Sequence, residues 1–195
     1  MIKIALTGPS GSGKGYVGAL FEKRCIPCLD TDQTVHELYR DPEFAKELSS
    51  ALNHGICAAD RTIDRPALAR LIFENDDAMK TLLALVYPAV RKKCKAFFEA
   101  QEASGKKAAV IDAPQLFEAG FEEDVDLIVT VDAPEDLRLQ RVIARDGISE
   151  EYALQRMKRQ RTGEEYAACS HYVLVNDGKN DVEAALDALL CKILK

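Results

Sequence analysis

Residues 2–14 read IKIALTGPSGSGK, and this stretch decides how the rest of the chain is interpreted. The apolar, β-branched run Ile2–Thr7 predicts a buried strand, and the pattern Tyr16–Lys23 predicts a helix. Glycines in the connecting loop let consecutive backbone N–H groups point into one concavity that cradles phosphate oxygens. The helix directs its positive end at the same anion, and Lys14 can reach the β- and γ-phosphates as a point charge. We therefore predict a phosphate-binding loop (P-loop) rather than a simple glycine-rich turn. The residues expected to bind the nucleotide are Gly8, Pro9, Ser10, Gly11, Ser12, Gly13, Lys14, Gly15 and Tyr16.

The residue after the lysine departs from the P-loop consensus, which has Ser or Thr there as a magnesium ligand. Gly15 has no hydroxyl, so magnesium must be held by phosphate oxygens, water and carboxylates elsewhere, which suits its tendency to keep several waters. The loop of adenylate-type kinases also ends in Gly-Lys-Gly, so the chain resembles a known variant here. Those loops usually continue with Thr, whereas this chain has Tyr16.

The composition favours one α/β domain and argues against several classes of partner. The chain has 195 residues, of which 47% are hydrophobic, and this is enough for a sizeable core. Its net charge of −6 makes it a poor candidate for broad binding to nucleic acid or to anionic membranes. No apolar run approaches the ~18 residues that span a bilayer, and the N-terminus lacks the layout of a signal peptide. We expect a cytoplasmic protein that is a monomer or a small homo-oligomer.

The six cysteines do not form a recognisable metal or redox motif. Cys25 and Cys28 make a Cys-x-x-Cys pair, but a zinc site would usually want a second such pair or a His pair nearby. We therefore expect reduced cysteines that pack in the interior.

Short apolar runs alternate with helical patterns along the whole chain. Such runs between helices predict a parallel sheet with helices on both faces. In sheets of this kind, ligands bind outside the carboxyl ends of the strands. The five expected strands are Ile2–Thr7, Ile26–Leu29, Ala108–Ile111, Leu127–Val131 and Tyr172–Val175.

A long helical stretch separates the second and third expected strands. Residues 33–105 exceed an ordinary crossover connection, and we interpret them as a helical insertion that binds an acceptor substrate. Asp41-Pro42 and Asp64-Arg65-Pro66 predict helix starts, and Pro88 predicts a third start or a kink. We therefore expect one domain over residues 1–195 with an acceptor subdomain, not two independent domains.

Carboxylates follow two of the expected strands. Asp30 and Asp32 close the second strand, and one of them could accept a proton from a substrate hydroxyl. The alternative is that Thr31 or Asp32 only caps the helix that follows. Val110-Ile111-Asp112 has the pattern of a Walker B strand, whose Asp holds magnesium directly or through water, so Asp112 is the predicted metal ligand.

Basic residues gather after the fourth expected strand. Arg138, Arg141 and Arg145 are three and four residues apart, so they share one face of a helix. Phosphoryl transfer needs cations that close over the γ-phosphate, and we interpret residues 138–165 as a helical lid, with Arg141 catalytic and Arg145 an ATP contact. The alternative is a solvated basic face paired with nearby carboxylates. After the last strand, Asn176 either holds an adenine edge or belongs to a plain turn.

In combination, these stretches resemble the dephospho-coenzyme A (dephospho-CoA) kinase family over essentially the whole chain. Each motif is short, but their order and spacing together are specific. The matching stretches are Thr7-Gly8-x-x-Gly11-Ser12-Gly13-Lys14, Asp30-Thr31-Asp32, Arg65-x-x-Leu68 with Ile72-Phe73, Pro114-x-Leu116-Phe117-Glu118, Arg141-x-x-x-Arg145-Asp146, Arg156-x-x-x-Gln160 and Asn176-Asp177-Gly178.

The resemblance implies transfer of the ATP γ-phosphoryl group to the 3′-hydroxyl of dephospho-CoA, with magnesium. It implies Asp32 as the base near that hydroxyl and a nucleoside-monophosphate-kinase-like fold with a core, a helical acceptor subdomain and a lid. The acceptor contacts implied are Asp32, Arg65, Tyr87, Pro114 and Leu116.

The chain departs from the family pattern at four positions. Besides Gly15, Tyr87 stands where the family usually has His, Gln115 interrupts a usual Pro-Leu-Leu, and His171 replaces a usual Asp. The changes at Tyr87 and Gln115 touch the acceptor side, so a P-loop kinase for another small hydroxyl or nucleotide acceptor is one alternative. A nucleotide-binding regulatory protein without catalysis is the other alternative, and Gly15 is its support.

Overall fold

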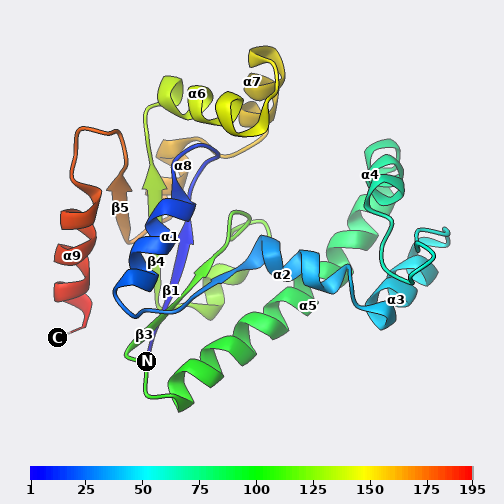
Figure 1. The fold of residues 1–195 in the computed structure, drawn as a ribbon, viewed down its shortest axis with the longest axis horizontal. Helices are drawn as coiled ribbons and strands as arrows, with labels where there is room; N and C mark the ends of the chain where they lie inside the picture. Colours follow the sequence, from blue (N-terminus) through cyan, green and yellow to red (C-terminus); the bar gives the residue numbers. More distant parts are fainter. Residues whose placement is uncertain (195) are drawn as a thin grey trace. The chain divides into compact units, whose positions relative to one another are not determined.

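The apolar runs expected as strands assemble into one sheet in the order β2-β3-β1-β4-β5 in the computed structural model, which describes residues 1–194 (Figure 1). The pairs β1–β3, β1–β4 and β4–β5 are parallel, as the alternation of strands and helices predicts. The second strand begins later than expected, one residue after Pro27, which has no N–H to donate to a strand ladder. The strands are β1 (Ile2–Thr7), β2 (Cys28–Asp30), β3 (Ala108–Asp112), β4 (Leu127–Asp132) and β5 (Tyr172–Val175).

The strand register brings three strand ends together at the carboxyl edge of the sheet. Leu6 of β1 is paired with Asp112 of β3, and Thr7 is paired with Thr130 of β4. The P-loop leaves β1 between these two neighbours, so it begins at the centre of the edge where ligands bind in parallel sheets.

The chain divides into two compact units, and the sheet, except for Asp30 at the end of β2, belongs to the one formed by Met1–Leu29 and the chain from Phe97 onward. Its main core contains Ile4, Leu6, Val110 and Val129, all 0% exposed. Helices α1 (Lys14–Lys23) and α9 (Val182–Ile193) contribute apolar side chains to this core, while α8 (Gly163–Ala168) lies against β4. Removing these apolar side chains from water is the main driving force for this packing.

The second unit, Asp30–Ala96, is helical. It holds α2 (Thr31–Leu38), α3 (Pro42–Leu52), α4 (Arg65–Glu74) and the first part of α5 (Asp76–Ala103). The caps of α3 and α4 are Asp41 and Asp64, each followed by a proline in the first turn, so both predicted helix starts are confirmed. Of the two outcomes predicted at Pro88, a helix start is wrong, because α5 is continuous through that residue, and a kink stays a prediction.

The region expected to form the lid is also helical and lies within the first unit. It contains α6 (Glu135–Asp146) and α7 (Glu150–Lys158). Outside this region, a short 3₁₀ helix, η1 (Phe121–Asp124), precedes β4. Gly147 ends α6 with φ +64°, a left-handed conformation that glycine adopts readily. That residues 138–165 close over the nucleotide stays a prediction.

The cysteines differ in part from the expectation. Cys94 is buried, but Cys25, Cys57, Cys169 and Cys191 are exposed, because the side of an element that faces solvent depends on tertiary packing. No helix within residues 1–194 combines the length and the apolar character needed to cross a membrane.

Candidate active site

Glycines shape the P-loop both through their backbone conformations and through the space around them. Gly8, Gly11 and Gly13 have φ values of +138°, +80° and +96°, a region that L side chains rarely adopt. A Cβ added at Gly8 would lie 2.1 Å from the Val131 carbonyl oxygen, and one at Gly11 would lie 2.4 Å from the backbone oxygen of Arg138. The loop is therefore packed against the end of β4 and the first turns of α6.

The start of α1 has the properties of an anion site. Gly13 is the N-cap residue and offers no side-chain cap to the helix. The Lys14 ammonium group donates a 2.9 Å hydrogen bond to the Gly8 carbonyl oxygen, so the lysine lies across the loop. The Ser12 hydroxyl is buried and has no hydrogen-bond partner within residues 1–194. These features fit a bound phosphate group, whose oxygens accept hydrogen bonds.

The two residues after Lys14 have different surroundings. A Cβ at Gly15 would meet nothing within 4 Å, so this position has room for a side chain. The Tyr16 hydroxyl donates a 2.8 Å hydrogen bond to Glu183 at the start of α9, and this hydrogen bond raises the pKa of Tyr16. The predicted nucleotide contact of Tyr16 stays a prediction, and the structure directs its hydroxyl to α9.

Arg141, predicted as a catalytic residue, and Asn176, predicted as an ATP contact, both contact the backbone of the P-loop. Arg141 Nη1 donates to the carbonyl oxygens of Gly11 at 3.2 Å and of Asn176 at 3.0 Å. The Asn176 side-chain amide donates to the Ser12 carbonyl oxygen at 2.9 Å. This bracing role was not apparent in the sequence, where the two residues stand far from the loop. Their predicted roles toward ATP remain untested.

Three other arginines of the lid region, Arg145, Arg156 and Arg161, are paired with carboxylates. Arg145 and Arg156 both contact Asp146, at 2.7 Å and 2.8 Å, and the hydrogen bond from Arg145 is the main cause of a lowered pKa of Asp146. Arg161 donates to Glu118 at 3.2 Å. The pairing with Asp146 that we considered as part of the alternative is present, but Arg138 is buried and Arg141 contacts backbone carbonyls, so these two do not form a solvated face with Arg145. The predicted contact of Arg145 with ATP remains a prediction.

The loop after β3 places one carboxylate beside the P-loop strand. Asp112 ends β3 next to Leu6, and the N–H of Ala113 donates to the Leu6 carbonyl oxygen at 2.9 Å. A carboxylate oxygen at this position suits magnesium, which prefers hard oxygen ligands and keeps several waters. Farther along this loop, the Pro114 carbonyl accepts the Tyr166 hydroxyl at 3.4 Å and Leu116 is fully buried. The acceptor contacts predicted for Pro114 and Leu116 stay predictions.

The remaining predicted residues lie in the second unit. Asp30 is the N-cap of α2 and accepts the Gln33 N–H at 3.0 Å, so the alternative that Thr31 or Asp32 caps the helix is wrong. The cap must have an extended backbone, and Asp30 still belongs to β2. Asp32 lies in the first turn of α2, Arg65 begins α4, and Tyr87 lies within α5. Their roles remain predictions.

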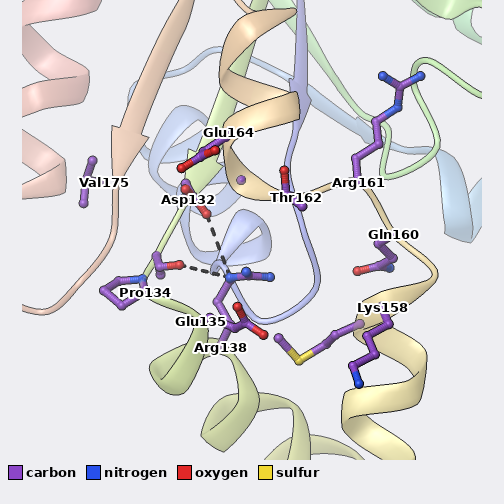
Figure 2. A pocket seen from close by; sticks show the side chains of 13 residues that line it. Asp132, Pro134, Glu135, Arg138, Lys158, Gln160, Arg161, Thr162, Glu164 and Val175 are labelled. Atoms are coloured by element: carbon purple, nitrogen blue, oxygen red, sulfur yellow. Dashed lines mark hydrogen bonds and ion pairs between the residues drawn. The ribbon is translucent and has the colours of Figure 1, made fainter.

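A pocket of about 730 Å³ lies beyond the end of β4, next to the lid region (Figure 2). Arg138, only 8% exposed, donates to the Ala133 carbonyl oxygen at 3.0 Å and lies 3.9 Å from Asp132. Lys158, Gln160 and Glu164 also line the pocket, so it carries charges of both signs.

The sequence analysis did not include Gln160 among the site residues, although Gln160 belongs to one of the motifs that match the family. Its side chain exchanges two hydrogen bonds with Ser10 of the P-loop, at 3.0 Å and 2.9 Å. The position of a glutamine in the Arg156-x-x-x-Gln160 motif could have marked it as a site residue. The sequence does not show that its hydrogen-bond partner is Ser10.

Comparison with known proteins gives a consistent result. A family model described as dephospho-CoA kinase matches residues 2–181. The dephospho-CoA kinase of Deinococcus radiodurans is 36% identical over 189 residues, which cover 96% of this chain and 90% of that protein. A crystal structure of a Thermus thermophilus protein has a TM-score of 0.83 and 34% identity, covering 98% of this chain and 97% of that one. The dephospho-CoA kinase of Campylobacter jejuni, 22% identical, shares the fold with a TM-score of 0.73 over 98% of this chain and 96% of its own.

Proposed function

This chain belongs to the dephospho-CoA kinase family, and on that premise we propose that it transfers the γ-phosphoryl group of ATP to the 3′-hydroxyl of dephospho-CoA. The family match over nearly the whole chain is the observation that carries this proposal. The 3′-oxygen attacks the γ-phosphorus, the bond to the β,γ-bridging oxygen breaks, and ADP leaves with that oxygen. The hydroxyl proton passes to a carboxylate, for which we propose Asp32.

The P-loop supplies the positions for the transferred phosphate. Backbone N–H groups at the start of α1 point toward the anion, and Lys14 lies across the loop, where its ammonium group can contact the β- and γ-oxygens. In our proposal Asp112 would hold magnesium on the protein side, and the metal would supply positive charge to offset that of the phosphates. Arg141 already contacts the loop carbonyls, and we propose that it also contributes positive charge near the transferring group.

We propose the helical unit Asp30–Ala96 as the acceptor-binding part of the enzyme. Arg65 at the start of α4 and Tyr87 within α5 are the proposed contacts, together with Pro114 and Leu116 of the loop after β3. We also propose the lid role of residues 138–165, a cytoplasmic location, and a monomer or small homo-oligomer in solution. Cell fractionation and light scattering test the last two.

The direct test offers the enzyme a panel of acceptors. Pure protein is incubated with ATP, magnesium and either dephospho-CoA, shikimate, AMP or another small alcohol, and the products are identified by mass. We expect a phosphate added at the 3′-position of dephospho-CoA alone. Turnover of another acceptor with no product from dephospho-CoA would overturn the proposal, and Tyr87 would then be the first residue to examine.

A further inference from the structure

Ser10, at the tip of the P-loop, is bound by a single distant side chain. Its backbone N–H donates to Gln160 Oε1 at 3.0 Å, and its hydroxyl oxygen accepts from Gln160 Nε2 at 2.9 Å. One carboxamide therefore uses both its acceptor oxygen and its donor NH₂ group on the same residue. Both hydrogen bonds are partly buried, so competition from water is reduced.

The chain around Gln160 is itself well anchored. The N–H of Gln160 donates to the Met157 carbonyl oxygen at 3.0 Å, at the end of α7. Arg161 lies over the Phe117 ring at 4.9 Å, and Thr162 starts α8 with a capping box completed by Glu165. Figure 2 shows Gln160, Arg161 and Thr162 following one another along this connecting segment. The carboxamide is therefore presented to Ser10 from a fixed backbone.

The P-loop is consequently held from two directions. Arg141 and Asn176 hold the carbonyl oxygens of Gly11 and Ser12, and Gln160 holds the N–H and hydroxyl of Ser10. The Ser10 N–H is committed to Gln160, and the Ser12 N–H donates to the Pro9 carbonyl oxygen at 3.2 Å, so both amides are ordered within the loop before a nucleotide arrives. A loop that is ordered before binding loses less conformational entropy when the nucleotide arrives.

We infer that Gln160 is a positioning residue for ATP: it holds the tip of the P-loop in the nucleotide-binding conformation from the segment that joins α7 to α8. The inference rests on the proposed function for its relevance to catalysis, but it concerns nucleotide affinity and not the identity of the acceptor. Gln160 acts on the loop through Ser10, and the effect of losing it is on ATP binding more than on the chemical step.

Three variants and one matched control test this inference. Gln160→Met keeps the length of the side chain and removes both hydrogen bonds, whereas Ser10→Ala removes only the one to the hydroxyl. The double variant completes a double-mutant cycle, which measures the coupling between the two residues. Gln155→Met is the control, because Gln155 is an exposed glutamine on α7 and undergoes the same substitution. The measurements are the ATP dissociation constant by calorimetry without acceptor, hydrogen exchange of the loop amides in the nucleotide-free protein, and the thermal midpoint.

We expect Gln160→Met to weaken ATP binding about tenfold, as two hydrogen bonds of ordinary net strength would. Ser10→Ala should weaken it about two- to threefold, and the double variant should match Gln160→Met, because Ser10 then has no carboxamide to bind. Loop amides should exchange faster in Gln160→Met, with kcat at saturating ATP within about twofold of the parent and the control unchanged.

Two results would overturn the inference. One is ATP affinity and loop exchange in Gln160→Met equal to those of Gln155→Met. The other is full additivity of Ser10→Ala and Gln160→Met, which would mean that the two residues act independently. If Gln160→Met is poorly folded, the affinity of Ser10→Ala still decides, since an unchanged value contradicts the inference. An enzyme that ignores dephospho-CoA would refute the proposed function but leave these binding and exchange results unaffected.

Discussion

The P-loop and the helical unit Asp30–Ala96 present functional groups in different ways. At the loop, Gly8 and Gly11 have no room for a Cβ and the carbonyls of Gly11 and Ser12 are held by side chains. In the helical unit, the residues proposed for the acceptor are side chains on α2, α4 and α5, and Phe73 of α4 is 83% exposed. On the proposed assignments, phosphate recognition would depend on backbone shape, whereas acceptor recognition would depend on side chains that can change without remodelling the fold.

Removing the charge of Lys14 should have the largest effect. Lys14→Ala should lower kcat/KM by about 10²–10³-fold, a loss typical of deleting one group that stabilises developing charge. Lys14→Arg should retain more activity, although the broad guanidinium does not replace a compact ammonium group. Steady-state kinetics and ATP titrations on the two variants check this, and near-parental turnover in Lys14→Ala would contradict the assignment of the nucleotide site.

Substitutions at Asp30 and Asp32 should separate a structural carboxylate from a catalytic one. Asp32→Asn should lower kcat about 10²-fold with little change in stability, at the low end for loss of a general base because the transition state is loose. Asp30→Ala should instead lower the free energy of unfolding by about 1 kcal/mol, since Asp30 caps α2. Steady-state rates and urea unfolding curves for both variants test these expectations. Equal small effects on the two values of kcat would contradict the assignment of Asp32 as the base.

Within the loop, the effect of adding a side chain should follow the available space. Gly11→Ala places a Cβ against the backbone of Arg138 at φ +80°, so ATP affinity should fall at least about tenfold and stability by about 1–2 kcal/mol. Gly15→Ser meets nothing within 4 Å and restores the consensus hydroxyl, so magnesium affinity should be unchanged or higher. Calorimetric titrations of ATP and magnesium test both, and a severe loss in Gly15→Ser would show that this glycine is required.

The smallest expected effect is a pH-dependent change in stability caused by Asp146, at the end of α6. The pKa of Asp146 is lowered in the folded protein by Arg145 and then Arg156, so its contribution to stability is present above the unfolded pKa of about 3.9. That contribution is lost as the pH falls through the lower, folded pKa. The thermal midpoint of the parent should slightly exceed that of Asp146→Asn at pH 7, and the difference should shrink steadily as the pH falls below the unfolded pKa. High salt should also reduce it, because the pair is near the surface. A difference that does not shrink with falling pH would point to another cause.

Local features of the sequence predicted much of the fold and the phosphate end of the site. Continuous apolar runs identified all five strands, and β1 and β5 have the expected bounds. For β1 the physical reason is its place at the centre of the parallel sheet, where both faces are covered and apolar residues are needed throughout. The contact between Ser10 and Gln160 could not be predicted, because it joins residues 150 positions apart. His171 is similar: its Nδ1 accepts the Ile128 N–H at 3.0 Å, an acceptor role that a residue type alone does not reveal. The cap of α2 is Asp30, whereas the alternative that we considered placed it at Thr31 or Asp32, because the choice depends on backbone angles that the sequence does not show.

Helix α5 has a consequence for exchanging parts between related enzymes. The border between the two units falls between Ala96 and Phe97, inside this continuous helix rather than in a loop. A chimera that joins the helical unit of one relative to the sheet of another must therefore be spliced within helical turns. Each residue gained or lost at the splice shifts the helical phase by about 100°. Natural recombination here should favour exchanges that conserve the length of α5, so acceptor preference would evolve by point substitution more readily than by module replacement.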